Sequence, residues 1–267
     1  MDEELQVEVL RLEDERSKHP ESLPILIKLA HLTRSSEVLQ DCLQVYQKRI
    51  LETGYTELSN DGALILEIAF DHWKSGFGSP LNYSHERRDF LTSLIALISR
   101  VETIDQLHLS HRFSYFASLI HESYGNFSKA LIYLSELISL QVKTAGVSLA
   151  ALILRAATLL IILNRFDEAI EYLEYLDDDD IIRDSKQRLL IVSLLHVTYR
   201  QSNRHEWLLP QVEERLFKLH GKVSKGDPPS SPTTVYLSVS EVFLPLCSFS
   251  SCLVLLREVQ MYVPFFK

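Results

Sequence analysis

The chain has 267 residues, of which only 8 are glycine and 9 proline, and 46% of them are hydrophobic. Scarce helix breakers and abundant leucine favour long helices over a turn-rich β fold, so we expect an all-α protein. The formal net charge of −9 argues against binding to nucleic acid or to an anionic membrane, because both need clustered lysine and arginine.

The start of the chain and its cysteines bear on the compartment. The sequence begins MDEELQ, without the basic and apolar regions of a targeting peptide. Its most apolar stretch, residues 242–256, contains Pro245 and is shorter than the ~20 residues of a spanning helix, so we expect no membrane insertion. Cys42, Cys247 and Cys252 are odd in number and lack zinc-ligand spacing, which favours a reducing compartment. We expect a cytoplasmic protein, with a nuclear or ciliary location left open.

The predicted elements are helices throughout. Residues 1–20 form an N-terminal capping helix with Leu5, Val9 and Leu12 on one face. Residues 21–220 form an array of helix hairpins, with a long loop at 78–88. A Pro/Ser-rich linker at 221–234 separates this array from a C-terminal helical hairpin at 235–267. The first helices of the hairpins are expected at 23–32, 62–73, 104–124, 147–163, 185–199 and 233–244.

A repeat organises these hairpins. The segment GNFSKALIYLSEL from Gly125 matches NRFDEAIEYLEYL from Asn164. Each has a polar turn, then Ala130 or Ala169, then leucines four and seven residues later, which is the spacing of one helix face. The same step of 39 residues leads from Ala169 to Leu208. Looser copies pivot on Leu39 and Leu91, and another begins at Ser248.

These hairpins resemble tetratricopeptide repeats (TPRs). In that family small residues occur where the two antiparallel helices touch, because bulky side chains there would force the helices apart. The resemblance implies a TPR-like α-solenoid of about six antiparallel helix hairpins, although the step exceeds the family's usual ~34 residues. The matching positions are Ala117, Ser118, Gly125, Ala130, Leu134 and Leu137, then Ala156, Ala157, Asn164, Ala169, Leu173 and Leu176, and more weakly His196, Tyr199, Asn203, Leu208 and Val212.

A related type of helical repeat, found in scaffolds of RNA-processing complexes, is the alternative resemblance. It also has longer units and aromatic-rich first helices, and His72, Trp73 and Trp207 are compatible with it. Such a scaffold would still bind proteins but would be nuclear, and the sequence has no basic import run.

No catalytic, cofactor-binding or metal-binding motif is present in the sequence. His108 and His111 could ligate a metal with a nearby carboxylate such as Asp105, but the sequence does not identify which residue would be the third ligand or which would support it, so a solvated or packed pair is the preferred interpretation. The acidic run at 177–180 is interpreted as a solvated turn that ends a helix, since it lacks the spacing of a calcium loop.

The inner faces of the first helices predict the binding site. The chaperone-tail binders that TPR domains include present lysine, arginine and asparagine there to clamp a terminal carboxylate, whereas this chain has mostly apolar residues. We therefore expect a groove for an apolar or amphipathic segment of a partner, unless a helix of the chain itself fills the groove. The expected partner-binding positions are Arg112, Tyr115, Leu119, Glu122, Leu154, Thr158, Ile161, Ser193, Val197 and Arg200.

The sequence therefore predicts a non-enzymatic protein–protein interaction scaffold or adaptor, which belongs to a larger complex and needs no cofactor or metal. The alternative is a scaffold of an RNA-processing complex built from the longer repeats. An enzyme would need convergent polar residues around a buried pocket, and no such cluster stands out in the sequence.

Overall fold

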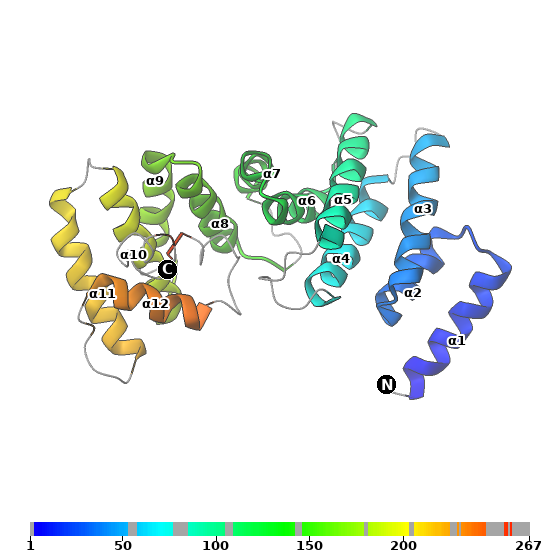
Figure 1. The fold of residues 1–267 in the computed structure, drawn as a ribbon, viewed down its shortest axis with the longest axis horizontal. Helices are drawn as coiled ribbons and strands as arrows, with labels where there is room; N and C mark the ends of the chain where they lie inside the picture. Colours follow the sequence, from blue (N-terminus) through cyan, green and yellow to red (C-terminus); the bar gives the residue numbers. More distant parts are fainter. Residues whose placement is uncertain are drawn as a thin grey trace. The chain divides into compact units, whose positions relative to one another are not determined.

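The computed structural model describes residues 3–52, 58–76, 85–104, 109–141, 146–178, 181–202, 206–224, 229, 231–243, 254, 255 and 257. Throughout these ranges the chain is helical, with short turns and no β-strand. It divides into two compact units, Met1–Asn126 (unit 1) and Phe127–Lys267 (unit 2), each of which is described by itself. Figure 1 shows the succession of helices within each unit. Within the described ranges, every helix is too short or too polar to cross a membrane.

Unit 1 is a stack of antiparallel helices. Helices α2 and α3 form one hairpin and α4 and α5 a second, while α2, α4 and α6 also contact one another in turn, as the first helices of successive repeats do. Ser110 caps α6 by accepting a hydrogen bond from the Phe113 amide, and Gly125 ends the helix with φ 94°. The helices are α1 (Glu3–Lys18), α2 (Leu23–Thr33), α3 (Ser36–Glu52), α4 (Leu58–Gly76), α5 (His85–Ile104) and α6 (His111–Tyr124).

The structure corrects two boundaries in this unit. The segment 104–124 was expected to be one helix, but α5 ends at Ile104 and α6 begins at His111, because the Ser110 side chain caps a new helix. The loop expected at 78–88 is shorter, since α5 already begins at His85. The rest of that loop lies outside the described residues.

Unit 2 continues the alternation of helices. Each of α7 to α11 packs on the next, and α12 packs on both α10 and α11. The two pivotal alanines of the repeat, Ala130 and Ala169, are fully buried as predicted. Asn164 occupies the turn between α8 and α9 with φ 58°, a conformation that asparagine tolerates. The elements are α7 (Phe127–Ser139), α8 (Leu149–Ile162), α9 (Phe166–Leu176), α10 (Ser185–Ser202), the 3₁₀ helix η1 (Glu206–Leu208), α11 (Leu209–Val223) and α12 (Pro232–Phe243).

The linker predicted at 221–234 is shorter in the structure. Helix α11 continues to Val223 and α12 begins at Pro232, so helical residues occupy both ends of the expected linker. In the second helix of the expected C-terminal hairpin, Val254 and Leu255 are helical and buried. Most of that helix lies outside the described residues.

Gly62 of α4 lies where three helices of unit 1 pack closely together. A β-carbon at this position would lie 2.3 Å from the Tyr46 hydroxyl of α3 and 3.2 Å from the Phe113 ring of α6. Both aromatic side chains are fully buried. One turn earlier, the Ser110 amide donates to the Ser59 hydroxyl at 2.6 Å, which also joins α6 to α4. Gly62 therefore allows three helices to meet at one point.

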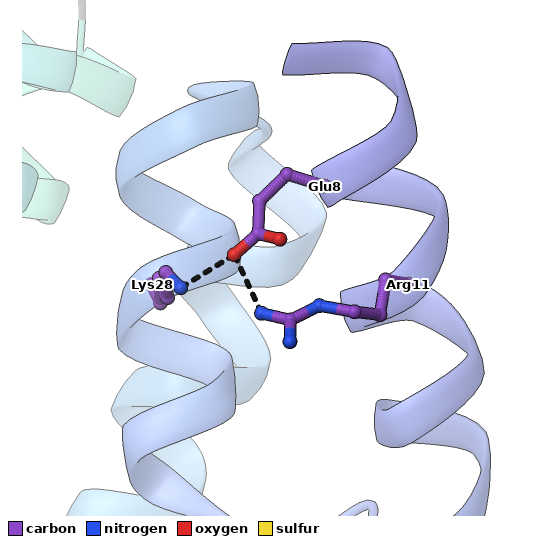
Figure 2. Close-up of polar contacts among 3 residues, drawn as sticks. All are labelled: Glu8, Arg11 and Lys28. Atoms are coloured by element: carbon purple, nitrogen blue, oxygen red, sulfur yellow. Dashed lines mark hydrogen bonds and ion pairs between the residues drawn. The ribbon is translucent and has the colours of Figure 1, made fainter. Parts of the chain in front are cut away.

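Helix α1 lies against α2 through one buried leucine and several ion pairs. Leu12 is the one fully buried leucine among its described residues. Figure 2 shows the Glu8 carboxylate between Lys28 of α2 and Arg11 of α1, at 2.5 and 2.7 Å. Hydrogen bonds from Lys28 and Arg11 lower the pKa of Glu8. Arg16 forms a further ion pair with Asp41 of α3. The structure thus places the predicted capping helix on the first hairpin.

We predict opposite effects for two glycine-to-alanine substitutions. Gly62→Ala should lower the free energy of unfolding by about 1–3 kcal/mol, because the new methyl group meets Tyr46 and Phe113. Gly221→Ala in α11 should raise it by up to ~1 kcal/mol, because its methyl group enters open space and alanine favours the helix. Urea denaturation followed by circular dichroism measures both. Equal stabilisation by the two substitutions would contradict the packing around Gly62.

A second prediction concerns the docking of α1. Leu12→Ala should speed amide hydrogen exchange throughout α1, because it removes the buried anchor of the helix. Leu10→Ala on the same helix is the control, since Leu10 is 65% exposed and should leave exchange unchanged. Added salt should also speed exchange in α1, because the ion pairs of Glu8 and Arg16 are partly exposed to solvent. Similar exchange in the two alanine variants would be evidence that Leu12 does not anchor α1.

Candidate functional site

The predicted site residues on α6 form a partly open face. Arg112 is exposed, while Tyr115 and Leu119 are half-buried and follow it by one and two turns on the same side of the helix. The Tyr115 ring packs edge-on against Phe116, with 5.3 Å between centroids, which fixes its direction. Glu122, the fourth predicted position on α6, is buried. Three of the four residues are therefore within reach of a partner.

Helix α4 extends this face. Arg112 forms an ion pair with Glu67, which is half-buried on α4, and half-buried Leu64 lies one turn before Glu67. We call Leu64, Glu67, Arg112, Tyr115 and Leu119 the unit 1 face. Leu64 and Glu67 were missed by the sequence analysis, although α4 was expected as the first helix of a hairpin. Continuing the inward-facing positions onto α4 would have found them.

The predicted positions in unit 2 are mostly closed. On α8, Leu154 is half-buried, but Thr158 and Ile161 are buried, and the Thr158 hydroxyl donates to the Leu154 carbonyl at 2.8 Å. On α10, Ser193 and Val197 have 0% exposure and only Arg200 is half-buried. Four of the six residues that were expected to line an open groove here are therefore packed inside the unit, and Leu154 and Arg200 remain partly accessible.

Helix α12 packs on α10, and the contact between them includes His196. Its Nδ1 atom shares a hydrogen bond with the hydroxyl of Tyr236, a fully buried residue of α12. The two rings lie 6.0 Å apart, centroid to centroid. Burial, with a smaller contribution from the positive charge of Arg200, lowers the pKa of His196 from 6.5 to about 4. His196 is therefore neutral near pH 7 and serves as a packed hydrogen-bonding group.

The acidic turn after α9 is only partly solvated. Asp177 caps α9 as predicted, but its side chain is 12% exposed and accepts a hydrogen bond from Arg215 of α11 at 2.7 Å. The neighbouring Glu174 accepts from the Tyr199 hydroxyl of α10 at 2.6 Å. Burial and this hydrogen bond raise the pKa of Tyr199. Asp178 is exposed, and residues 179 and 180 lie outside the described ranges. These acids connect α9, α10 and α11.

Few of the described residues are candidates for metal binding or nucleophilic chemistry. No cluster there combines enough His, Cys, Asp or Glu side chains to hold a metal ion. His111 is exposed, and Asp105 and His108 fall outside the described ranges. Burial raises the pKa of the Cys42 thiol to about 12, which makes it a poor nucleophile near pH 7.

A cavity of about 270 Å³ lies at the start of α9. Two of its charged side chains, Arg165 and Glu168, bind each other at 2.6 and 2.7 Å, so they already compensate one another. The cavity is lined by Asn164, Arg165, Phe166, Asp167, Glu168 and Ser202. Nothing in this lining indicates a particular ligand.

Comparisons with known proteins support the fold. No family model matches the sequence, and no curated protein matches it. Among solved structures, the chain is similar to a crystal structure of nearly identical TPR-like repeats from a Podosopora anserina protein described as a kinesin light chain. The two share 13% sequence identity with a TM-score of 0.50, over 78% of this chain and 99% of the other. The chain has an all-α, TPR-like helical repeat fold.

The low pKa of His196 predicts a loss of stability in acid. The unfolded chain binds a proton at this residue near pH 6.5, whereas the folded chain does so only near pH 4. Neutral His196 therefore makes its full contribution to the free energy of unfolding above pH 6.5. This contribution decreases as the pH falls towards 4, by at most ~3 kcal/mol. His196→Gln removes this contribution, so its unfolding free energy should fall less than that of the wild type between pH 7 and 4. Parallel pH profiles would contradict the prediction.

Proposed function

We propose that this chain is a non-enzymatic scaffold or adaptor that binds an apolar or amphipathic segment of a partner protein on the unit 1 face. The TPR-like repeat fold supports the general function, because stacked helix hairpins are commonly used as surfaces for protein–protein interaction. In this proposal the chain acts through shape and apolar burial as a subunit of a larger complex.

The observation that carries the proposal is the accessibility of Tyr115 and Leu119. These apolar side chains lie one turn apart on α6 and remain partly open, whereas Ser193 and Val197, the predicted positions on α10, are fully buried. Interface hot spots are typically aromatic or large side chains in a desolvated centre with a polar rim. The Arg112–Glu67 ion pair provides such a rim beside Tyr115.

The same ion pair indicates which chemistry the partner brings. A clamp for a terminal carboxylate needs uncompensated positive charge, but Glu67 already occupies Arg112. An apolar side chain, by contrast, gains by covering Tyr115 and Leu119. The proposed partner segment therefore presents an apolar side chain to α6 and keeps polar groups towards the rim.

The predicted residues of unit 2 that remain accessible, Leu154 and Arg200, belong to a separate surface in this proposal.

The absence of clustered basic residues in an acidic chain of net charge −9 favours proteins over nucleic acids as partners. We place the scaffold in the cytoplasm, as the sequence analysis does.

A charge introduced at the centre of the unit 1 face tests the proposal. Leu119→Asp should abolish the capture of specific proteins from cell lysate, because burying an unpaired carboxylate in the interface costs more than the contact provides. Ile132→Asp is the control, since Ile132 is 61% exposed on α7 and outside the face. Quantitative mass spectrometry compares the captured sets, and circular dichroism checks that both variants fold. Identical sets for the wild type and Leu119→Asp would overturn the assignment of the face.

A further inference from the structure

Helix α10 is enclosed on all sides. Every residue from Leu189 to Tyr199 is buried, including the side that the sequence assigns to the binding groove. In an open array of helix hairpins, the inner side of each first helix stays accessible, as it does on α6. Some part of the chain must therefore cover this side of α10.

The covered side of α10 offers a neighbouring helix mainly apolar contacts. On this side the Ser193 hydroxyl donates to the Leu189 carbonyl at 2.7 Å, and elsewhere on α10 the Thr198 hydroxyl donates to the Leu194 carbonyl at 2.6 Å. These hydroxyls are satisfied within the helix and require nothing from a neighbour. His196 differs, because its Nδ1 forms its hydrogen bond with another helix. A covering helix thus needs apolar side chains and one group that pairs with His196.

Helix α12 meets both requirements. Its buried side chains Val235, Tyr236 and Val239 form one stripe, and the Tyr236 hydroxyl reaches His196. Leu237 points elsewhere and is 41% exposed. Figure 1 shows α12 crossing α10 and α11, whereas α9, α10 and α11 run more nearly along one another.

The connection to α12 suits a tethered segment. Residues between Ser224 and Pro232 separate it from α11, in the stretch that the sequence marks as a Pro/Ser-rich linker. The Thr234 amide at the start of α12 donates to the Ser231 carbonyl at 3.1 Å, so the helix begins with a local turn. A short tether holds its segment at a millimolar effective concentration, and such a segment outcompetes a weak external ligand.

We propose that α10 carries a second interaction surface, which α12 occupies as an internal ligand. The partner that this surface fits is an amphipathic helix in which two valines flank a tyrosine with the spacing of Val235, Tyr236 and Val239. Such a helix binds only when α12 is released. This surface is independent of the unit 1 face, so the proposed function and this inference can fail separately.

The test offers α12 back to the full-length chain as a separate peptide. A fluorescent peptide of residues 232–243 is titrated against the wild type and against the double variant Val235→Asp with Val239→Asp, whose own α12 should no longer dock. We expect the variant to bind the peptide at least ~10-fold more tightly than the wild type, measured by fluorescence anisotropy. Leu237→Asp is the matched control on the exposed side of α12 and should behave as the wild type does.

Two further changes map the contact. A peptide carrying Tyr236→Ala, or a double variant that also carries His196→Ala, should bind at least ~10-fold more weakly, because each change removes one side of the hydrogen bond. Equal binding of the original peptide to the wild type and the double variant would overturn the proposal. Loss of overall helicity in the double variant would also overturn it, since α12 would then be an integral part of the core.

Amide hydrogen exchange of the wild type gives a second, independent measurement. A docked internal ligand opens on its own, so the α12 amides should exchange through an opening that leaves the α10 amides protected. If α10 and α12 exchange together at the rate of global unfolding, α12 is not separable and the proposal fails. Neither measurement involves Tyr115 or Leu119, so the result leaves the unit 1 face unaffected.

Discussion

Small side chains allow the described helices to pack closely, and the arrangement of each unit depends on these contacts. Gly62 brings α4 against Tyr46 of α3 and Phe113 of α6, and in unit 2 the small residues Ala130 of α7 and Ala169 of α9 are fully buried. Because the backbones lie close together, the larger apolar side chains on either side interlock and exclude water. The direction of each first helix, and thus the position of Tyr115 and Leu119, follows from these contacts.

The two units use their first helices differently. On α6 the inward-facing residues remain partly open beside the Arg112–Glu67 ion pair. On α10 the equivalent side is buried, and the His196 ring there forms a hydrogen bond with the Tyr236 hydroxyl of α12. One repeat pattern thus produces an accessible face in unit 1 and an occupied one in unit 2. Helix α12 packs on α10 and α11, and its Tyr236 hydroxyl lies on this side of α10, at His196.

The regular spacing of apolar and small residues was sufficient to predict most of the described helices and the pairing of α2 with α3, α4 with α5, α8 with α9 and α10 with α11. It failed where a single side chain decides a boundary, as Ser110 does at the start of α6. It also failed to tell open positions from closed ones. Ser193 and Thr158 were expected to line an open groove for an apolar or amphipathic segment, yet both are buried and each hydroxyl donates to a carbonyl of its own helix. Exposure depends on a distant helix, and the periodicity of one segment carries no information about it.

The burial of Cys42 determines how unit 1 responds to oxidants. The thiol lies in the interior of unit 1, on the same helix as Tyr46, and burial raises its pKa to about 12. The thiolate is the form that reacts with oxidants and attacks disulfides, whereas at neutral pH this sulfur is protonated and shielded by burial. Changes in cellular redox poise should therefore leave unit 1 intact. Cys42 is compatible with oxidising and reducing compartments alike, and its presence in the sequence is weaker evidence for a reducing one than the cysteine count suggests.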